Sequence, residues 1–508
     1  MRRVELTRPS VETRSVEPTV NKPSLLRVTI IAKRQLKFIE HVLHEPPFIV
    51  MISRMSEALN SSKPLSIPPE GSEKICHICG RLQEAFGLSR LPDDLRSIIV
   101  ANTSVKDGAL VCSRCVELFS RAKQQIDSHA AIFEQVSFVL PTPLRMNADE
   151  RFTGRGVTIA FLDSGFYAHP DLVKPENRMV AYHSIFEKDG DPTSLQTIDV
   201  ASWHGMMTSV VAVGNGYLSE GLYKGIAPDA KAVLVKIGKT GHIPEANIDR
   251  GLRWVLEHKD KYDIRVVNIS AGGDFEQPYV HNDLCQTVEL AVREGLIVVC
   301  AVGNAGMAPG HPVLPPASSP AAISVGGLDD QNSFDRARRG MYRSSYGPTI
   351  DGLQKPEVIA PGIWVAAPIL PNTPTADQAH VYSELEAAED NYLQSIIESH
   401  LGVDKDLDEA RDLPVPLLRQ LITIKLYEGN VINQHYKFVD GTSFASPIVA
   451  SIVACMLEAN PSLTPQQVKR ILIETAERVP GVEVERQGWG VVTPRSAVEL
   501  SHTLRQRT

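Results

Sequence analysis

The chain has 508 residues, of which 43% are hydrophobic and 22% are charged, as is typical of a globular protein with a sizeable core and two to four domains. Its net charge of −8 argues against nucleic acid as a partner. The apolar runs fall well short of the roughly 20 residues that a membrane span requires, so we expect no membrane partner.

The first 140 residues differ in composition and sequence pattern from the rest of the chain. Residues 1–23 are polar, rich in Arg, Glu, Thr and Pro, and are predicted to be disordered; they carry no apolar stretch typical of a secretory signal. The region 24–140 begins with apolar patches at 24–60 that fit neither helix nor strand clearly. A Ser/Pro-rich connector then leads to a module that carries cysteines at about 73–137.

The two cysteine pairs of this module, CHIC and CSRC, form a CxxC…CxxC pattern. Each pair can turn two thiolates onto one metal ion, so Cys76, Cys79, Cys112 and Cys115 are predicted to bind a structural zinc ion. The 32-residue spacer is longer than the common 15–20, and redox thiols or core cysteines are the alternatives.

An odd total of seven cysteines suits a reducing compartment, which favours a cytoplasmic protein. Residues 73–134 hold eight basic and eight acidic side chains, so protein docking or regulation is favoured over nucleic-acid binding. Cys285, Cys300 and Cys455 lie in apolar runs and are predicted to be core thiols.

From about residue 141, short β-branched runs alternate with helical patterns. In chain order these are VTIAFL, MMTSVVAVG, AVLVKI, IDRGLRWVLEH, VVNIS, LCQTVELAVREG and LIVVCAV. Strands that alternate with helices indicate βαβ units, so an α/β fold with a parallel sheet flanked by helices is predicted. Such sheets carry their chemistry at the C-terminal ends of the strands.

Four polar residues stand at predicted strand ends or helix starts. Asp163 follows VTIAFL, and Asn304 follows LIVVCAV; each is by itself explained as a turn residue. His204 and Ser443 stand where helices begin, and each is by itself explained as a surface or capping residue. Capping and turns alone do not readily explain why all four residues lie around one sheet. The chain order Asp…His…Ser is one of the known orders of a catalytic triad.

Six segments extend this pattern: TGRGVTIAFLDSGFYAHPDL, WHGMMTSVVA, VVNISAGG, VVCAVGNAG, KPEVIAPG and DGTSFASPIVASIVACML. In that order they resemble the subtilisin-like serine proteases over residues 141–508, less one insertion. The resemblance implies that Ser443 is the nucleophile, that His204 is its base and that Asp163 orients His204. It also implies that Asn304 donates to the oxyanion. Any capping of the helix at Ser443 then falls to neighbours such as Thr442.

The resemblance further implies that substrate lies extended along Ser270, Ala271, Gly272 and Gly273. The chain departs from the family at Met206 and Met207, where Thr-His is usual, and at Ile448, where His is usual. Asp171 matches a position that often binds calcium, but GNGYLSEGLYKG does not clearly supply the other ligands, so calcium stays open.

Residues 372–438 form an insertion that the family does not require. It holds twelve acidic and five basic residues, and Val381, Leu385, Leu393, Tyr392 and Ile396 predict one amphipathic helix, with a second at PLLRQLITIKLY. A lid or partner surface is the functional interpretation, and a decorated surface loop is the alternative.

The function predicted is therefore that of a cytoplasmic serine endopeptidase that acts on protein or peptide substrates. Its zinc module and acidic insertion are expected to regulate or target it, with a regulatory protein partner at one of them. The alternative is a catalytically silent or self-processing subtilase fold that serves as a protein-binding adaptor. The presence of all four chemical positions argues against this alternative.

Overall fold

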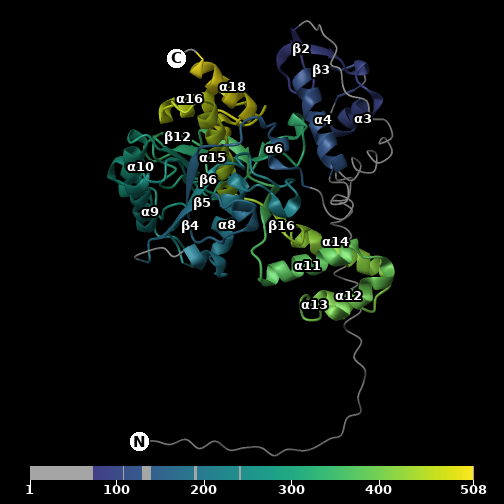
Figure 1. Cartoon of the computed structure of the whole chain (residues 1–508). Helices are drawn as coiled ribbons and strands as arrows, with labels where there is room; N and C mark the ends of the chain where they lie inside the picture. Colours follow the sequence, from purple (N-terminus) through teal and green to yellow (C-terminus); the bar gives the residue numbers. More distant parts are fainter. Residues whose placement is uncertain are drawn as a thin grey trace, which may run out of the picture. The chain divides into compact units, whose positions relative to one another are not determined.

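The computed structural model describes residues 73–103, 105–106, 108–128, 139–187, 192–239 and 242–506 (Figure 1). The predicted disorder at 1–23 and the apolar patches at 24–60 lie outside the described residues.

A mostly parallel sheet forms the centre of the larger part of the chain. In chain order its strands are β4 (Thr158–Asp163), β5 (Met179–Ser184), β6 (Lys231–Lys236), β7 (Ile264–Ile269), β8 (Ile297–Ala301), β9 (Ile323–Asp329), β10 (Gly340–Met341) and β13 (Val358–Pro361). The order across the sheet is β10-β9-β8-β7-β4-β6-β5, with β13 also paired to β9. Only β10 runs antiparallel to its neighbour, so the predicted α/β fold is confirmed.

Helices cover the sheet on both faces. They are α6 (Thr142–Arg145), α7 (Pro170–Val173), α8 (Ser202–Val213), α9 (Glu245–His258), α10 (Asp283–Arg293), α15 (Thr442–Ala459), α16 (Pro465–Thr475), α17 (Val484–Gln487) and α18 (Pro494–Arg505). Shorter 3₁₀ turns are η1 (Leu88–Arg90), η2 (Pro192–Gln196), η3 (Tyr217–Ser219), η4 (Tyr279–His281), η5 (Arg336–Arg338) and η6 (Asp390–Tyr392). A small hairpin pairs β11 (Gly347–Pro348) with β12 (Gln354–Lys355).

Successive side chains of each strand point to opposite faces of the sheet, so each strand contributes to two cores. In β4, Ile159 and Phe161 join the core that α8 and α15 complete, while Ala160 and Leu162 join the core under α9 and α10. All four side chains are fully buried, which explains why the strand reads as a continuous apolar run rather than an alternating one.

Helix α15 is the most apolar helix of the fold. It is long and hydrophobic enough to cross a membrane by composition alone, with a mean hydropathy of 1.5. However, 89% of it is buried inside the protein, where it packs on α8, α18 and strands β7, β8 and β9. The composition of α15 therefore reflects its place in the core.

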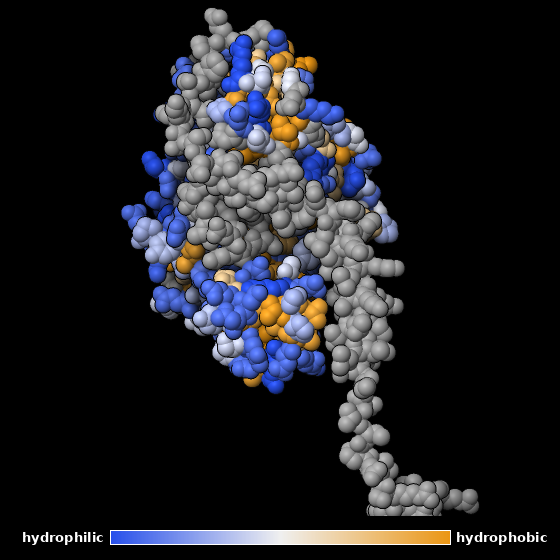
Figure 2. Space-filling model, turned by 90° about the vertical axis from the view of Figure 1, so that its right-hand side faces the viewer, coloured by the Kyte–Doolittle hydropathy of each residue, from blue (hydrophilic) through white to orange (hydrophobic). Residues whose placement is uncertain are grey.

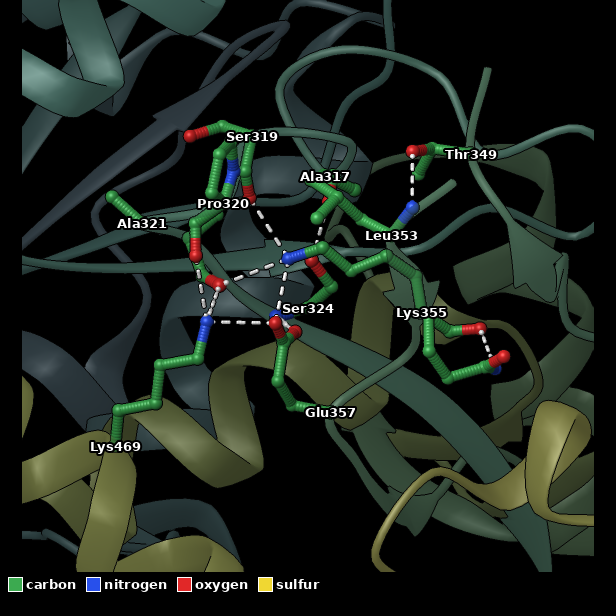
Figure 3. A network of polar contacts seen from close by, with 12 residues as sticks. Ala317, Ser319, Pro320, Ala321, Ser324, Thr349, Leu353, Lys355, Glu357 and Lys469 are labelled. Carbon is green, nitrogen blue, oxygen red and sulfur yellow. Dashed lines mark hydrogen bonds and ion pairs between the residues drawn. The ribbon is translucent and has the colours of Figure 1, made fainter. Parts of the chain in front are cut away.

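A buried ion network joins β12, the residue before β13, β9 and α16 (Figure 3). Glu357 Oε1 accepts from Lys355 Nζ at 2.6 Å and from Lys469 Nζ at 2.7 Å, while Oε2 accepts from the N–H of Ser324 at 2.7 Å. Burial lowers the pKa of Lys355; burial would raise the pKa of Glu357, but the two ammonium groups hold it below its usual value. The carboxylate therefore neutralises two cations that the core has largely removed from water.

The cysteine module combines a small sheet with helices. It contains β1 (Glu73–Ile75), β2 (Leu82–Gly87), β3 (Leu110–Cys112), α3 (Asp93–Asn102) and α4 (Ser113–Ser128), and its strands pair antiparallel in the order β1-β2-β3. Ion pairs join α4 to α18: Arg114 to Glu499 and Arg495 to Glu117, both at 2.8 Å.

The insertion folds into helices with a core of their own. Its elements are α11 (Pro374–Ala387), α12 (Leu393–Ser399), α13 (Lys405–Ala410), α14 (Val415–Glu428), β15 (Val431–Asn433) and β16 (Tyr436–Val439). The single helix predicted from 381–396 was wrong, because α11 ends at Ala387 and α12 starts at Leu393. Tyr392, expected on the buried face, is 55% exposed.

Strand pairing connects the end of the insertion to the part of the chain that carries the central sheet. β14 (Val365–Pro368) pairs antiparallel with β16, so the two ends of the insertion lie side by side. Figure 2 shows a surface that mixes hydrophilic with apolar side chains, and Leu401 and Leu417 are the exposed leucines of the described insertion.

Candidate functional site

Asp163 and His204 meet at the C-terminal edge of the sheet. Asp163 is the last residue of β4, and His204 lies in the first turn of α8. His204 Nδ1 lies 2.8 Å from Oδ1 and 2.9 Å from Oδ2 of Asp163. The side chain of Asp163 is 1% exposed and that of His204 is 21% exposed. The carboxylate is therefore buried, whereas the imidazole remains partly accessible to a substrate.

Gly205 allows this close approach. A side chain at this position would meet the carbonyl oxygen of Gly165 at 2.1 Å and Cβ of Asp163 at 2.9 Å. Helix α8 can therefore pack against the end of β4 only with glycine after the histidine.

Two further residues hold the carboxylate of Asp163, one through a side chain and one through its backbone, and sequence reasoning missed both. Thr208 Oγ1 donates to Oδ2 at 3.1 Å, and the N–H of Ser164 donates to Oδ1 at 2.7 Å. Thr208 follows His204 by four residues, which places both on one face of α8. This spacing is the signal that could have identified Thr208.

The carboxylate controls the protonation of the histidine. Burial alone would lower the pKa of His204, but the charge of Asp163 and the hydrogen bond to it raise the pKa above its ordinary value. A carboxylate held by hydrogen bonds thus stabilises the imidazolium form.

Ser443 lies in the first turn of α15, after a glycine with an unusual backbone. Gly441 has φ of +136°, a conformation that residues with a side chain rarely adopt. Ser443 Oγ contacts the carbonyl oxygen of Ser270 at 3.4 Å, and Ser270 Oγ donates to the carbonyl of Ser443 at 2.9 Å. His204 also lies beside this turn, because its ring is 5.7 Å from that of Phe444.

The amide of Asn304 is oriented by the start of α15. Its Oδ1 accepts from the N–H of Thr442 at 2.9 Å and from Thr442 Oγ1 at 3.1 Å. A backbone N–H can only donate, so Oδ1 must face Thr442 and the NH₂ group must face the other way. Asn304 is solvent-exposed, and its Nδ2 lies on the side of Gly441.

This arrangement corrects the expected capping role. Thr442 does not cap α15, because the N-cap residue is Gly441 and no side chain of the helix itself forms a cap bond. Asn304, which follows β8, satisfies the first N–H instead.

The predicted substrate segment borders a cavity beside the histidine. Ser270, Ala271 and Gly272 line a cavity of about 410 Å³ together with Asp163, Ser164, Val200, Ala201, Trp203, His204, His242 and Ile243. Gly273 lies just outside, where its N–H is bonded to the carbonyl of Pro315 at 2.6 Å. Among the residues that line this cavity, none belongs to the insertion.

The three departures from the family pattern fall in the core. Met206, Met207 and Ile448 are all buried in the cluster that packs α8 against α15. Apolar side chains suit this environment, since buried polar groups there would need partners.

The four cysteines of the module come together. Cys76 Sγ lies 3.8 Å from Cys115 Sγ, and Cys79 Sγ lies 3.8 Å from Cys112 Sγ. Metal–sulfur bonds of about 2.3 Å in a tetrahedron place sulfurs about 3.8 Å apart, so this set fits a metal ion.

Gln83 faces two of the four sulfurs. Its Nε2 donates to Cys112 Sγ at 3.0 Å and to Cys79 Sγ at 3.2 Å. Hydrogen bonds with Cys112 and Cys115 lower the pKa of Cys79 to about 6, whereas hydrogen bonds with the other three cysteines, together with burial, raise the pKa of Cys115. By contrast, Cys285, Cys300 and Cys455 are buried core thiols as predicted, and burial raises the pKa of each.

The surroundings of Asp171 do not fit calcium. Its carboxylate is fully buried and accepts from Tyr436 Oη at 2.7 Å and from the N–H of Leu218 at 3.1 Å. The Arg178 guanidinium donates to the backbone carbonyls of Asp171 and Val213. The carboxylate of Asp171 is thus satisfied by donors of the protein itself, and burial raises the pKa of Asp171, which disfavours the charged form that calcium needs.

Comparison with known sequences identifies the family to which these features belong. The sequence model of the subtilase family matches residues 154–490, more than half of the chain. The chain belongs to the subtilase family. This subtilase is 29% identical to the serine protease AprX of Bacillus subtilis (strain 168) over 358 residues, which cover 69% of this chain and 67% of AprX. Together with the family match and the other relatives that are named serine proteases, this match classes it as a serine endopeptidase.

Other relatives are matched over shorter stretches. The major intracellular serine protease of the same organism is 29% identical over 156 residues, which cover 30% of this subtilase but 44% of that protein. Among solved structures, fervidolysin from Fervidobacterium pennivorans, a keratinolytic enzyme related to subtilisin, is 20% identical with a TM-score of 0.47. That match covers 70% of this subtilase and 45% of fervidolysin.

Proposed function

We propose that this subtilase cleaves peptide bonds with Ser443 as nucleophile, His204 as general base and Asp163 as the residue that orients the imidazole. The bond of 2.8 Å between His204 Nδ1 and Asp163 carries the proposal, because it leaves Nε2 as the nitrogen that can take the serine proton. Ser443 Oγ contacts the carbonyl of Ser270 in the substrate-free chain. Catalytic hydrogen bonds often tighten only when substrate binds, so this contact is compatible with the role.

Two donors are available for the oxyanion. The Asn304 NH₂ group is one, because its carbonyl oxygen is already held by Thr442. The N–H of Ser443, at the positive end of α15, is the other. Substrate lies extended along Ser270, Ala271, Gly272 and Gly273, with its side chains toward the cavity beside His204.

The cysteine cluster holds a structural zinc ion in this proposal. The sulfur spacing of 3.8 Å and the four sulfur ligands suit a tetrahedral zinc ion, and Gln83 donates a hydrogen bond to two of the sulfurs. A reduced tetrathiolate site is typical of the cytoplasm, and two relatives are named intracellular serine proteases, whereas a third is named an extracellular protease. The tetrathiolate site and the two intracellular relatives support a cytoplasmic location.

The zinc module regulates or targets the protease through α4 and α18. Arg336 Nη1 donates to the carbonyl of Cys79 at 3.0 Å, and Arg336 also pairs with Glu477. The ring of Phe119 on α4 packs edge-on against Phe334 at 5.4 Å. These contacts connect the metal-binding loop to the residues after β9, so a partner protein bound to the module can act on the protease.

The test of the catalytic assignment is covalent labelling of the full chain with a serine-directed fluorophosphonate, combined with peptide cleavage. Wild type should be labelled on Ser443 and should cleave peptide; Ser443→Ala should do neither while keeping its thermal midpoint. Ser446→Ala is the matched control, since Ser446 is a buried serine of the same helix bonded to Asn268 at 2.7 Å. Undiminished labelling of Ser443→Ala refutes the assignment.

The test of the metal assignment is elemental analysis after expression in zinc-replete medium. About one tightly held zinc per chain is expected, and Cys112→Ser should remove it without loss of fluorophosphonate labelling per folded chain. A wild-type chain without tightly held zinc contradicts the assignment.

A further inference from the structure

A second group of metal-ligand side chains lies in the insertion, outside the catalytic site and the cysteine cluster. His380 and Glu384 stand one turn apart on α11, and His400 follows the last residue of α12. One ligand atom from each of the three lies within 4.8 Å of the other two. Among the described residues, this is the one such group besides the four cysteines.

The distances suit ligands of one ion. Glu384 Oε2 lies 3.0 Å from His400 Nε2 and 3.8 Å from His380 Nε2. Ligand atoms about 2.1 Å from a tetrahedral ion lie about 3.4 Å apart, which is between these two values. The two imidazole planes are at 80° with ring centres 5.7 Å apart, so the rings do not stack. Both Nε2 atoms instead lie near the same oxygen, Oε2 of Glu384.

A neighbouring residue fixes one of the histidines. Gln434, in the turn between β15 and β16, places its Oε1 3.2 Å from His380 Nδ1. An oxygen acceptor there holds the proton on Nδ1 and leaves Nε2 free to bind a metal. Histidines that bind a metal through one ring nitrogen usually have a hydrogen-bond partner on the other nitrogen. A simple ion pair between His380 and Glu384 does not require the bond to Gln434.

We propose that His380, Glu384 and His400 bind a divalent transition-metal ion of the zinc type, distinct from the ion at the cysteines. Two imidazoles and one carboxylate favour such an ion over calcium or magnesium, which prefer oxygen ligands. The side chains are between 27% and 53% exposed, so the ion can exchange with solvent and keeps a coordination position open to water.

Metal bound at this site connects α11, α12 and the β15–β16 turn. Gln434 precedes Tyr436 by two residues, and β16 then leads directly to Gly441 and Ser443. Occupancy of the exposed site therefore stabilises the hairpin that carries the chain back to the protease.

The experiment is a calorimetric titration of the full chain with Zn²⁺. Ser443→Ala in every variant prevents self-cleavage, and the cysteine site is filled beforehand. One further zinc ion should bind, and Glu384→Gln or His400→Asn should weaken it at least tenfold. Gln434→Ala, which removes no ligand, should weaken it by about 10–100-fold. Glu389→Gln and His502→Asn are the matched controls, as both are exposed and outside the group.

Cobalt distinguishes the two sites, because cobalt–thiolate absorption in the near ultraviolet is absent when nitrogen and oxygen are the ligands. The variants should lose only the weaker visible bands and keep the thiolate band. Circular dichroism and the metal-free thermal midpoint establish that the variants are folded. The proposal is overturned if no further zinc ion binds, or if zinc binding is the same in Glu384→Gln and His400→Asn as in the controls.

Discussion

Asn304 offers the sharpest test of the proposed active site, because the role observed for its amide oxygen and the role proposed for its NH₂ group can be separated. The oxygen accepts from the first N–H of α15 at 2.9 Å, and the NH₂ group is directed to the proposed oxyanion position. Asn304→Asp keeps an oxygen for the helix and replaces the donor with a negative charge. Asn304→Ala removes both.

The expected magnitudes differ accordingly. Loss of an oxyanion donor costs about 10²–10³ in kcat, or about 2.7–4 kcal/mol, a value established for this donor in subtilisin itself. Asn304→Ala should show this loss and should also lower the free energy of unfolding by about 1 kcal/mol, because the helix loses its cap. Asn304→Asp should lose at least 10³ in kcat, since its charge opposes the oxyanion, yet should keep full stability because an anion suits a helix N-terminus.

Two measurements check these values. Cleavage of a chromogenic peptide, corrected by active-site titration, gives kcat and KM; urea unfolding in a Ser443→Ala background gives stability without self-cleavage. If Asn304→Asp retains more than about a tenth of wild-type kcat, Asn304 is not an oxyanion donor. If the two variants are equally destabilised, the capping argument is wrong.

Three further predictions concern pH, the buried ions and calcium. The pKa of His204 is raised by Asp163, so kcat/KM should fall toward acid with a midpoint above 6.5, and a midpoint below 6.5 would contradict the geometry. By the same shift, the pair stabilises the fold fully below pH 6.5 and loses this contribution as pH rises through the folded pKa. Glu357→Gln leaves two lysines without a counter-ion and should lower the free energy of unfolding by about 3–5 kcal/mol in urea, whereas the exposed control Glu474→Gln should cost under about 1 kcal/mol. Millimolar calcium should raise the thermal midpoint no more than magnesium does at equal ionic strength; a calcium-specific rise of several degrees would show that Asp171 binds it after all.

The sequence predicted the features that depend on short segments. β4, β6, β7 and β8 are buried runs of β-branched residues, and their side-chain period is local, so these strands could be found. Asp163 could be placed at a strand end for the same reason. The pairing of two CxxC motifs predicted the cysteine cluster, because the ligand pattern is itself local.

The features that were missed depend on contacts between distant segments. Tyr436 lies 265 residues from Asp171 in sequence, and no local pattern indicates that its hydroxyl meets that carboxylate. Asn304 caps a helix that begins 138 residues later, so the expectation that Thr442 would cap it was reasonable but wrong. The break between α11 and α12 follows from packing within the insertion, which overrides a continuous apolar stripe.

The position of β16 would let the insertion affect Ser443, the proposed nucleophile, without lining the cavity. β16 pairs with β14 on one side and with β15 on the other, and the hydroxyl of Tyr436 anchors it to Asp171. Gly441 N–H is bonded to the carbonyl of Gly362 at 2.7 Å. Gly441 has a positive φ that residues with a side chain rarely adopt, and Ser443 follows two residues later. A shift of β16 therefore changes the first turn of α15, where the serine lies. A protein or metal bound to the insertion would accordingly act on the orientation of Ser443, and peptides and folded substrates would be affected alike, whereas a lid would hinder folded substrates more.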